Sequence, residues 1–161
     1  KTTEQLKYFI DPDAPEFVPQ GNIPRRIQEY CKNTNQSVPE SIGEIVRCIN
    51  ESLALKYRMS LEEIEDCTGK TYDTIYMVGG GTQSQLLCQF TANSCGRRVV
   101  AGPVEATVLG NIALQLVASG DVKNLQEARN LIANSQNIKI YEPQDQEQWN
   151  QAYKHFRNLI Q

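Results

Sequence analysis

The sequence predicts an α/β protein in which several helices pack on a small sheet. Three observations lead to this class. Apolar side chains recur at helical spacing between residues 39 and 65, short β-prone runs alternate with helix-compatible segments after residue 70, and glycines separate several of these segments. Alternating strands and helices are typical of layered α/β domains. The 161 residues suffice for one domain with a buried core.

The first part of the chain is expected to be irregular and then helical. Residues 1–21 are rich in proline and predict a coil with an extended piece at Tyr8-Phe9-Ile10. In residues 22–69, Pro24 opens a helix that runs to about Lys32. A second helix spans about Pro39 to Glu65 and ends at Thr68-Gly69. One face of the second helix is expected to be buried: Ile42, Ile45, Val46, Ile49, Leu53, Tyr57, Leu61 and Ile64.

Residues 70–161 predict the sheet and the helices around it. The expected strands are Thr74–Val78, Arg97–Ala101 and Ile138–Tyr141. The expected helices are Ser84–Ser94, a helix with Glu105 in its first turn that closes at Gly120, Leu125–Ala133, and a final amphipathic helix with Trp149, Ala152, Tyr153, Phe156 and Ile160 on its apolar side. The helix closed by Gly120 carries an apolar stripe of Leu109, Ile112, Ala113, Leu116 and Val117. Gly110 inside it predicts a close backbone crossing, because glycine destabilises a helix interior by about 1 kcal/mol.

Composition excludes several classes of function. The net charge is −3 and no Lys/Arg cluster is present, which argues against nucleic-acid binding. The longest apolar stretch is too short to cross a bilayer, and no secretory signal is visible. The five cysteines lack the close spacing of a zinc site, so no metal ligands are predicted. Their odd number fits a reducing cytoplasm, although Cys31 and Cys48 flank a helical corner where either a disulfide or simple packing is possible.

The glycine turn at residues 79–81 is the most informative motif. Gly79, Gly80 and Gly81 join a strand to a helix, where the lack of a Cβ lets another molecule approach the backbone closely. Free N–H groups at the start of such a helix suit a polar ligand, and Gln83 and Gln85 stand where they could hold a base or ribose. The spacing matches neither a Walker A loop nor a dinucleotide fingerprint. A nucleotide site and a purely structural turn both remain open from these residues.

A second strand-to-helix turn, Gly102-Pro103-Val104-Glu105, would lie beside the first if the two strands are parallel neighbours. Glu105 is expected to cap its own helix rather than bind a ligand. No catalytic residue is predicted, because His155 belongs to a terminal amphipathic helix and no nucleophile–base set can be assembled around it. The residues alone therefore indicate a nucleotide-binding α/β module.

Two runs resemble the C-terminal part of the FGGY family of carbohydrate kinases. These are the sixteen residues that start at Val78 with the triple glycine, and Arg98 to Ile112 with Ala-Gly-Pro-Val-Glu-Ala-Thr at residues 101–107. Upstream runs at Phe9-Ile-Asp-Pro-Asp and Val38-Pro-Glu-Ser are similar to the family as well, and the resemblance weakens after about Leu131. It implies that residues 1–161 are part of the C-terminal lobe, which has a ribonuclease-H-like (actin-like ATPase) fold. It also implies ATP with Mg²⁺ and a sugar substrate, namely L-rhamnulose, with fuculose, xylulose or glycerol as alternatives.

In this family the triple glycine meets the adenosine part of ATP, which points to Gly80 first and to Gly79, Gly81, Gln83 and Gln85 as its neighbours. The family's catalytic aspartate motif does not occur in this sequence, and Lys1 resembles a cut inside a longer protein. The chain alone is therefore expected to be inactive and to self-associate through exposed apolar surface. A non-catalytic actin-like nucleotide-binding module is the alternative from another class.

Overall fold

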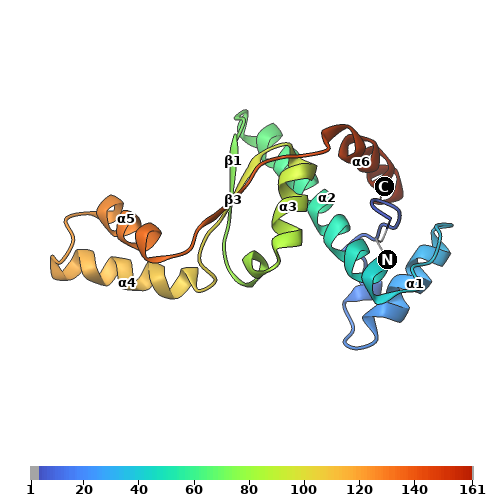
Figure 1. Ribbon diagram of the computed structural model, residues 1–161, viewed down its shortest axis with the longest axis horizontal. Coiled ribbons are helices and arrows are strands. Elements are labelled where there is room, and N and C mark those ends of the chain that lie inside the picture. The colour runs from blue at the N-terminus through green and yellow to red at the C-terminus, as the bar shows by residue number, and fades with distance from the viewer. Residues whose placement is uncertain (1–3, 161) are drawn as a thin grey trace.

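A three-stranded sheet lies at the centre of the computed structural model, which describes residues 4–160 (Figure 1). Its strands are β1 (Thr74–Met77), β2 (Arg98–Ala101) and β3 (Lys139–Tyr141). β1 and β2 are parallel, whereas β3 runs antiparallel to β2. All three expected strands are found within about a residue of their predicted bounds. The α/β class predicted from the sequence is confirmed.

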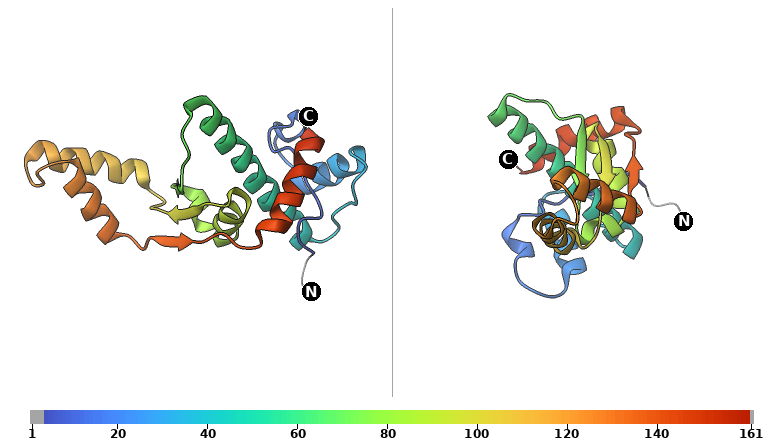
Figure 2. Two further views of the ribbon diagram at one scale, coloured as in Figure 1. Left: turned by 90° about the horizontal axis from the view of Figure 1, so that it is seen from above. Right: turned by 90° about the vertical axis from the view of Figure 1, so that its left-hand side faces the viewer.

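Four helices form the body around this sheet: α1 (Ile23–Asn33), α2 (Ile42–Thr68), α3 (Gln85–Cys95) and α6 (Gln146–Ile160). α3 covers one face of the sheet, where Cys88 and Ala92 pack against Val99 and Ala101. α2 and α6 pack against α3 on its other side (Figure 2). Local sequence sets the ends of α2, because Ser41 and Glu44 form a capping box at its start and Gly69 adopts the left-handed conformation (φ 63°) at its end.

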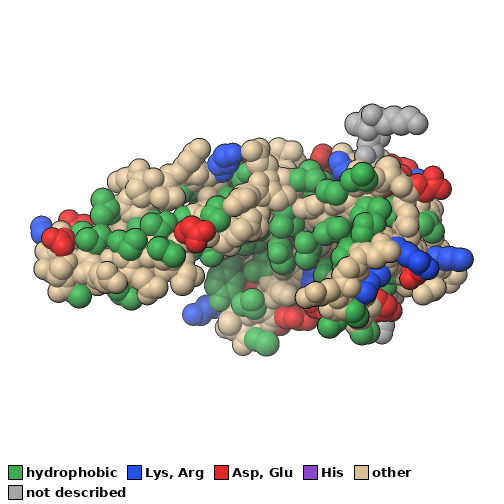
Figure 3. All heavy atoms as spheres, turned by 90° about the horizontal axis from the view of Figure 1, so that it is seen from below, with side chains coloured by type: hydrophobic (Ala, Val, Ile, Leu, Met, Phe, Trp, Pro, Cys, Tyr) green, Lys and Arg blue, Asp and Glu red, His purple; other side chains and the backbone are tan. Residues whose placement is uncertain are grey.

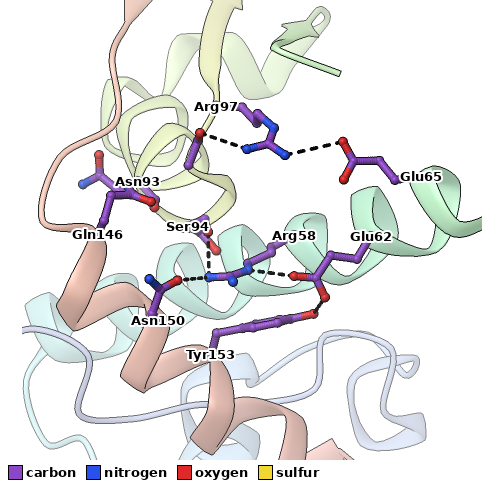
Figure 4. Close-up of polar contacts among 10 residues, drawn as sticks. Arg58, Glu62, Glu65, Asn93, Ser94, Arg97, Gln146, Asn150 and Tyr153 are labelled. Atoms are coloured by element: carbon purple, nitrogen blue, oxygen red, sulfur yellow. Dashed lines mark hydrogen bonds and ion pairs between the residues drawn. The ribbon is translucent and has the colours of Figure 1, made fainter. Parts of the chain in front are cut away.

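The main core lies where α2, α3 and α6 meet. Trp149 and Phe156 of α6 are 1% and 0% exposed, and they pack with Leu55 and Phe90. The predicted apolar side of the final helix is therefore core, as expected for its period. A ring of polar contacts borders this core (Figure 4): Arg58 of α2 donates to Glu62, to the Ser94 carbonyl of α3 and to Asn150 of α6.

The N-terminal segment is irregular, apart from a 3₁₀ turn at Pro15–Phe17, and its Tyr8, Phe9, Ile10 and Ala14 are buried. The Phe9 N–H donates to Gln36 Oε1 at 2.9 Å, and Gln36 Nε2 donates back to the Phe9 carbonyl at 2.8 Å. The Ile10 N–H donates to Ser52 Oγ of α2 at 3.0 Å. Polar side-chain atoms of Gln36 and Ser52 thus satisfy backbone groups of a strand-like segment that has no sheet neighbour.

Cys31 and Cys48 belong to a second small core with Tyr8 and Ile10, and both are free thiols. The interaction between the two thiols lowers the pKa of Cys31 and raises that of Cys48. Of the two interpretations left open by the sequence, packing is the one observed.

Helices α4 (Ala106–Ser119) and α5 (Leu125–Ser135) form a hairpin that projects from the body as an arm (Figures 1 and 2). The two helices pack on each other, and only Ala113 and Ala128 in them are fully buried. In the predicted apolar stripe of α4, Ala113 is buried, Leu109, Leu116 and Val117 are half-buried, and only Ile112, at 45%, is exposed. The expected backbone crossing at Gly110 is wrong, because within residues 4–160 a Cβ built there would meet no atom of another segment within 4 Å.

Hydrophobic side chains also run along the arm and across the middle of the face shown in Figure 3. No helix within residues 4–160 is long and apolar enough to cross a membrane.

Candidate functional site

The two strand-to-helix turns lie side by side at one edge of the sheet. Met77 of β1 is paired with Ala101 of β2, so both strands end at the same level. Beyond the strands, the Gly102 N–H donates to the Met77 carbonyl at 2.8 Å and the Gly79 N–H donates to the Pro103 carbonyl at 3.1 Å. β1 and β2 are thus parallel neighbours, and the prediction that the two turns lie side by side depended on this arrangement. This edge is where open α/β sheets bind their ligands.

The three glycines of the turn differ in whether their backbone conformation requires a glycine. Gly79 has φ 86° and ψ −169°, a conformation that essentially only glycine adopts. Gly80 and Gly81 begin a short 3₁₀ turn that runs to Gln83, and their backbone conformation is open to other residues. A Cβ built on Gly80 would meet no atom of the described chain within 4 Å. Gly79 is therefore a structural glycine, whereas open space surrounds Gly80.

Ser84 connects this turn to α3. Its Oγ accepts from the Leu87 N–H at 3.2 Å and caps the helix. The first helical bond joins the Cys88 N–H to the Ser84 carbonyl, so the N–H groups of Gln85 and Leu86 have no partner within the helix. The start of α3 thus presents hydrogen-bond donors and the positive end of the helix dipole.

A cavity of about 230 Å³ lies in front of this helix start. Gln83 and Gln85 line it, whereas Gly79, Gly80 and Gly81 do not. The structure therefore separates the five candidate residues into two groups: the glutamines line the cavity, and the glycines form the turn just before it in the chain. The whole lining is Thr82, Gln83, Gln85, Ala101, Gly102, Pro103, Val104, Gln136, Asn137 and Lys139.

Lys139 is the one ionisable side chain in this lining. Its positive charge acts on the neighbouring Cys88, whose pKa is nevertheless raised because burial has the larger effect. Glu105 stands at the N-cap position of α4 rather than in its first turn, and its side chain makes no capping hydrogen bond. The expectation that Glu105 caps its own helix is therefore wrong.

Carboxylates are absent from the lining, and within residues 4–160 no group of three His, Cys, Asp or Glu side chains could hold a metal ion. Mg²⁺ prefers carboxylate and phosphate oxygens, so the residues at this cavity do not fit a protein-bound Mg²⁺. His155 is exposed on α6 and belongs to other surface hollows.

Three lining residues, Gln136, Asn137 and Lys139, were not among the candidates predicted from the sequence. They follow the arm and reach the cavity only because β3 pairs antiparallel with β2, opposite Ala101. Sequence patterns do not reveal strand pairing of this kind, and no signal in residues 136–139 marks them.

Comparison with known proteins identifies the origin of the two turns. The model of the C-terminal domain of the FGGY family of carbohydrate kinases matches residues 1–119. The chain belongs to the FGGY family of carbohydrate kinases. Both turns, α3 and all of α4 lie inside the matched FGGY region, whereas the cavity residues 136–139 lie outside it.

Individual relatives agree with this assignment. The chain is 43% identical to the rhamnulokinase of Bacteroides thetaiotaomicron over 98% of its length and 38% identical to that of Bacillus subtilis over 90%. It spans about a third of these curated relatives, 32% and 30% of their lengths respectively.

The crystal structure of the xylulose kinase from Rhodospirillum rubrum is similar in fold, with a TM-score of 0.60 at 18% identity. That similarity covers 77% of this chain and 25% of the xylulose kinase. A sugar-kinase fold therefore accommodates these elements.

Proposed function

We propose that this chain forms the adenosine side of the ATP site in an FGGY sugar kinase that phosphorylates L-rhamnulose. The main support for this proposal is the pair of hydrogen-bonded turns at the carboxyl ends of β1 and β2. The side-chain amides of Gln83 and Gln85 line the cavity beside these turns. The choice of sugar is supported by the similarity to two rhamnulokinases. The proposal includes a cytoplasmic location and the assignment of residues 1–161 to the C-terminal lobe.

The proposed site acts by binding and orientation. Phosphoryl transfer depends mainly on positioning the reactants and on stabilising charge with metal and polar groups. Gln83 and Gln85 each offer a donor and an acceptor to a base or ribose. The open backbone at Gly80 leaves room for the nucleotide to lie against the chain. Any Mg²⁺ bound with ATP would be held by groups other than these residues, because the cavity lining has no carboxylate.

Calorimetric titration with ATP and ADP tests this site. Gly80→Val is the informative variant, because its new side chain has open space in the unliganded protein and would occupy the path of the ligand. We expect the wild-type chain to bind both nucleotides and Gly80→Val to lose roughly tenfold or more in affinity, about 1.4 kcal/mol. Gly110→Ala on the arm, which is not part of the cavity lining, is the control.

Equal binding by the wild type and Gly80→Val would remove Gly80 from the site. Thermal melts of both proteins distinguish a lost contact from a lost fold. Gly79→Ala is unsuitable for this purpose, since its positive φ makes a structural cost of roughly 1–3 kcal/mol inevitable.

The sugar assignment requires a complete active site, which a chimera supplies. These 161 residues replace the matching part of the Bacteroides thetaiotaomicron rhamnulokinase, to which they are 43% identical. We expect the chimera to phosphorylate L-rhamnulose in a coupled ADP assay and the same chimera with Gly80→Val to be impaired. A folded chimera without activity on L-rhamnulose would contradict the proposal that this chain belongs to an L-rhamnulose kinase.

A further inference from the structure

The cavity lies at the base of the arm, between the chain that enters it and the chain that leaves it. Pro103 and Val104 lead into α4, and Gln136 and Asn137 follow α5. Lys139 then begins β3 beside Ala101, at the edge where β1 and β2 end. The segment Gln136–Lys139 therefore forms a wall opposite the start of α3. In Figure 1 this is the narrow connection between the arm and the sheet.

The local conformation holds this wall in place. The Ile138 N–H donates to the Gln136 carbonyl at 3.1 Å, which makes a tight turn just before the sheet begins. Pairing of Lys139 with Ala101 then anchors the end of the segment. Gln136 and Asn137 are thus brought to the cavity by backbone bonds, which leaves their amide side chains available to a ligand.

The chemistry of the lining favours a neutral heterocycle. Four side-chain amides line the cavity, those of Gln83, Gln85, Gln136 and Asn137, and each has both a donor and an acceptor. Within the described part of the chain, Gln136 Nε2 has one long hydrogen bond, to Ser135 Oγ at 3.4 Å, and the other three amides have none. By contrast, the amide of Gln89 on the next turn of α3 is bonded to Asn93 and to the Glu142 carbonyl.

Size limits the ligand to one end of a nucleotide. A volume of about 230 Å³ is below the roughly 300–1,000 Å³ of pockets that enclose drug-sized ligands. A triphosphate would need several cations, and Lys139 is the only one in the lining. A base with ring nitrogens and an exocyclic amine matches amides and one ammonium donor better than a triphosphate does.

We propose that Gln136, Asn137 and Lys139 form the second wall of the nucleoside pocket and hydrogen-bond the base of the nucleotide. The inference rests on the proposed function and adds specificity-determining residues that lie outside the matched FGGY region. A base held there contacts the chain on both sides of the arm. Ligand binding therefore also fixes the position of the arm relative to the sheet.

Paired titrations with adenosine and ATP test the proposal. The variants are the double substitution Gln136→Ala/Asn137→Ala and the single substitution Lys139→Met. The matched control is Asn130→Ala/Asn134→Ala, which removes two exposed amides from α5 outside the lining. Two lost hydrogen bonds should weaken binding by about tenfold, and by the same factor for adenosine and ATP because both carry the base. Hydrogen exchange at residues 103–105 and 136–139 should slow with adenosine alone.

The titrations distinguish several outcomes. If the wild type binds and the double variant binds with the same affinity, Gln136 and Asn137 do not contact the base, and the proposed function is unaffected. Weakening of ATP binding with unchanged adenosine binding assigns the segment to the phosphates and overturns the base contact. A wild-type chain that binds neither ligand contradicts the proposed function and this inference together. Matching melting temperatures of the variants and the control exclude loss of fold as the cause.

Discussion

At the scale of single residues, Arg58 connects three helices. Its guanidinium donates to Glu62 Oε1 at 3.0 Å, to the Ser94 carbonyl at 3.1 Å and to Asn150 Oδ1 at 2.8 Å (Figure 4). It also lies 4.1 Å from the ring centroid of Tyr153, whose hydroxyl donates to Glu62 Oε2 at 2.6 Å. Only the planar fork of arginine reaches these partners together.

We predict that Arg58→Met lowers the free energy of unfolding by about 2 kcal/mol, because it leaves the Ser94 carbonyl and the Glu62 carboxylate short of a partner. Arg58→Lys should cost roughly half as much, since an ammonium keeps the charge but cannot replace the fork. Urea titration of the three proteins measures the differences. A cost below about 0.5 kcal/mol for Arg58→Met would mean that the cluster is solvated and contributes little.

The lowered pKa of Glu44 predicts that the free energy of unfolding depends on pH. Hydrogen bonds from the Ser41 backbone, the Ser41 side chain and the Glu40 backbone lower the pKa of Glu44 from its usual 4.5 to about 2. The unfolded chain therefore binds more protons between these values. The stability that Glu44 contributes is complete above about pH 4.5 and is lost as the pH falls towards 2.

Glu44→Gln keeps a side chain that can occupy the capping box but cannot ionise. We expect the unfolding free energy of this variant to fall less steeply than that of the wild type between pH 5 and pH 2. Urea unfolding at stepped pH values measures both curves. Parallel curves would show that Glu44 is not coupled to folding in this range.

At the scale of elements, the arm helix α4 carries a glycine without a packing reason. Gly110 lies mid-helix, and a Cβ added there would meet no atom of another described segment within 4 Å. We predict that Gly110→Ala raises the unfolding free energy by about 0.5–1 kcal/mol through helix propensity and a less flexible unfolded chain. Gly102→Ala is the contrast, because its Cβ would meet Val78 Cγ1 at 3.3 Å and the Met77 carbonyl at 3.4 Å.

Thermal melts of both alanine variants compare the two sites. The expected order places Gly110→Ala above the wild type and Gly102→Ala below it. Destabilisation by Gly110→Ala would mean that another segment packs against this face of α4 in solution.

Elements were predictable from the sequence where the signal is local. Glycines with left-handed backbone end α2 at Gly69, α3 at Gly96 and α4 at Gly120, as their positions in the sequence indicate. The joined turns were predictable because parallel neighbouring strands bring their ends together. The burial of Phe9 and Ile10 was not, since it depends on single side chains such as Gln36 and Ser52 that lie far along the chain.

Some residues of the candidate site were likewise predictable from local sequence, and others were not. Gln83 and Gln85 follow directly from the glycine turn, so local reasoning found them. Gln136, Asn137 and Lys139 are brought to the cavity by the return of the chain from the arm. Their position depends on the length of two helices and on an antiparallel pairing, neither of which leaves a mark on the residues themselves.

At the scale of the whole molecule, one face of the sheet is uncovered. Tyr76, Val100 and Ile140 form a row across the three strands, and α3 packs on the opposite face. Tyr76 is 75% exposed and Ile140 is 59% exposed. Among residues 4–160, β1 also has no partner on its outer edge. Apolar faces and free strand edges of this kind favour association.

We predict that the chain self-associates in a concentration-dependent way and that Tyr76→Lys/Ile140→Lys shifts it towards the monomer. Charged side chains on the row would have to be desolvated on association, which opposes contact between copies. Sedimentation velocity over a concentration series measures both proteins, with Arg129→Lys on the exposed side of α5 as a neutral control. A wild-type chain that stays monomeric at all concentrations contradicts the prediction.

Phosphoryl transfer requires chemical groups that nucleotide binding does not. The cavity offers amides and one ammonium, and it contains no carboxylate that could accept a proton from a sugar hydroxyl or bind Mg²⁺. Positioning one end of ATP without a base or a metal site does not lower the barrier of transfer. We therefore expect these 161 residues to bind ATP without turnover above background in a coupled ADP assay with L-rhamnulose. Measurable turnover that Gly80→Val abolishes would show a catalytic group within the chain itself.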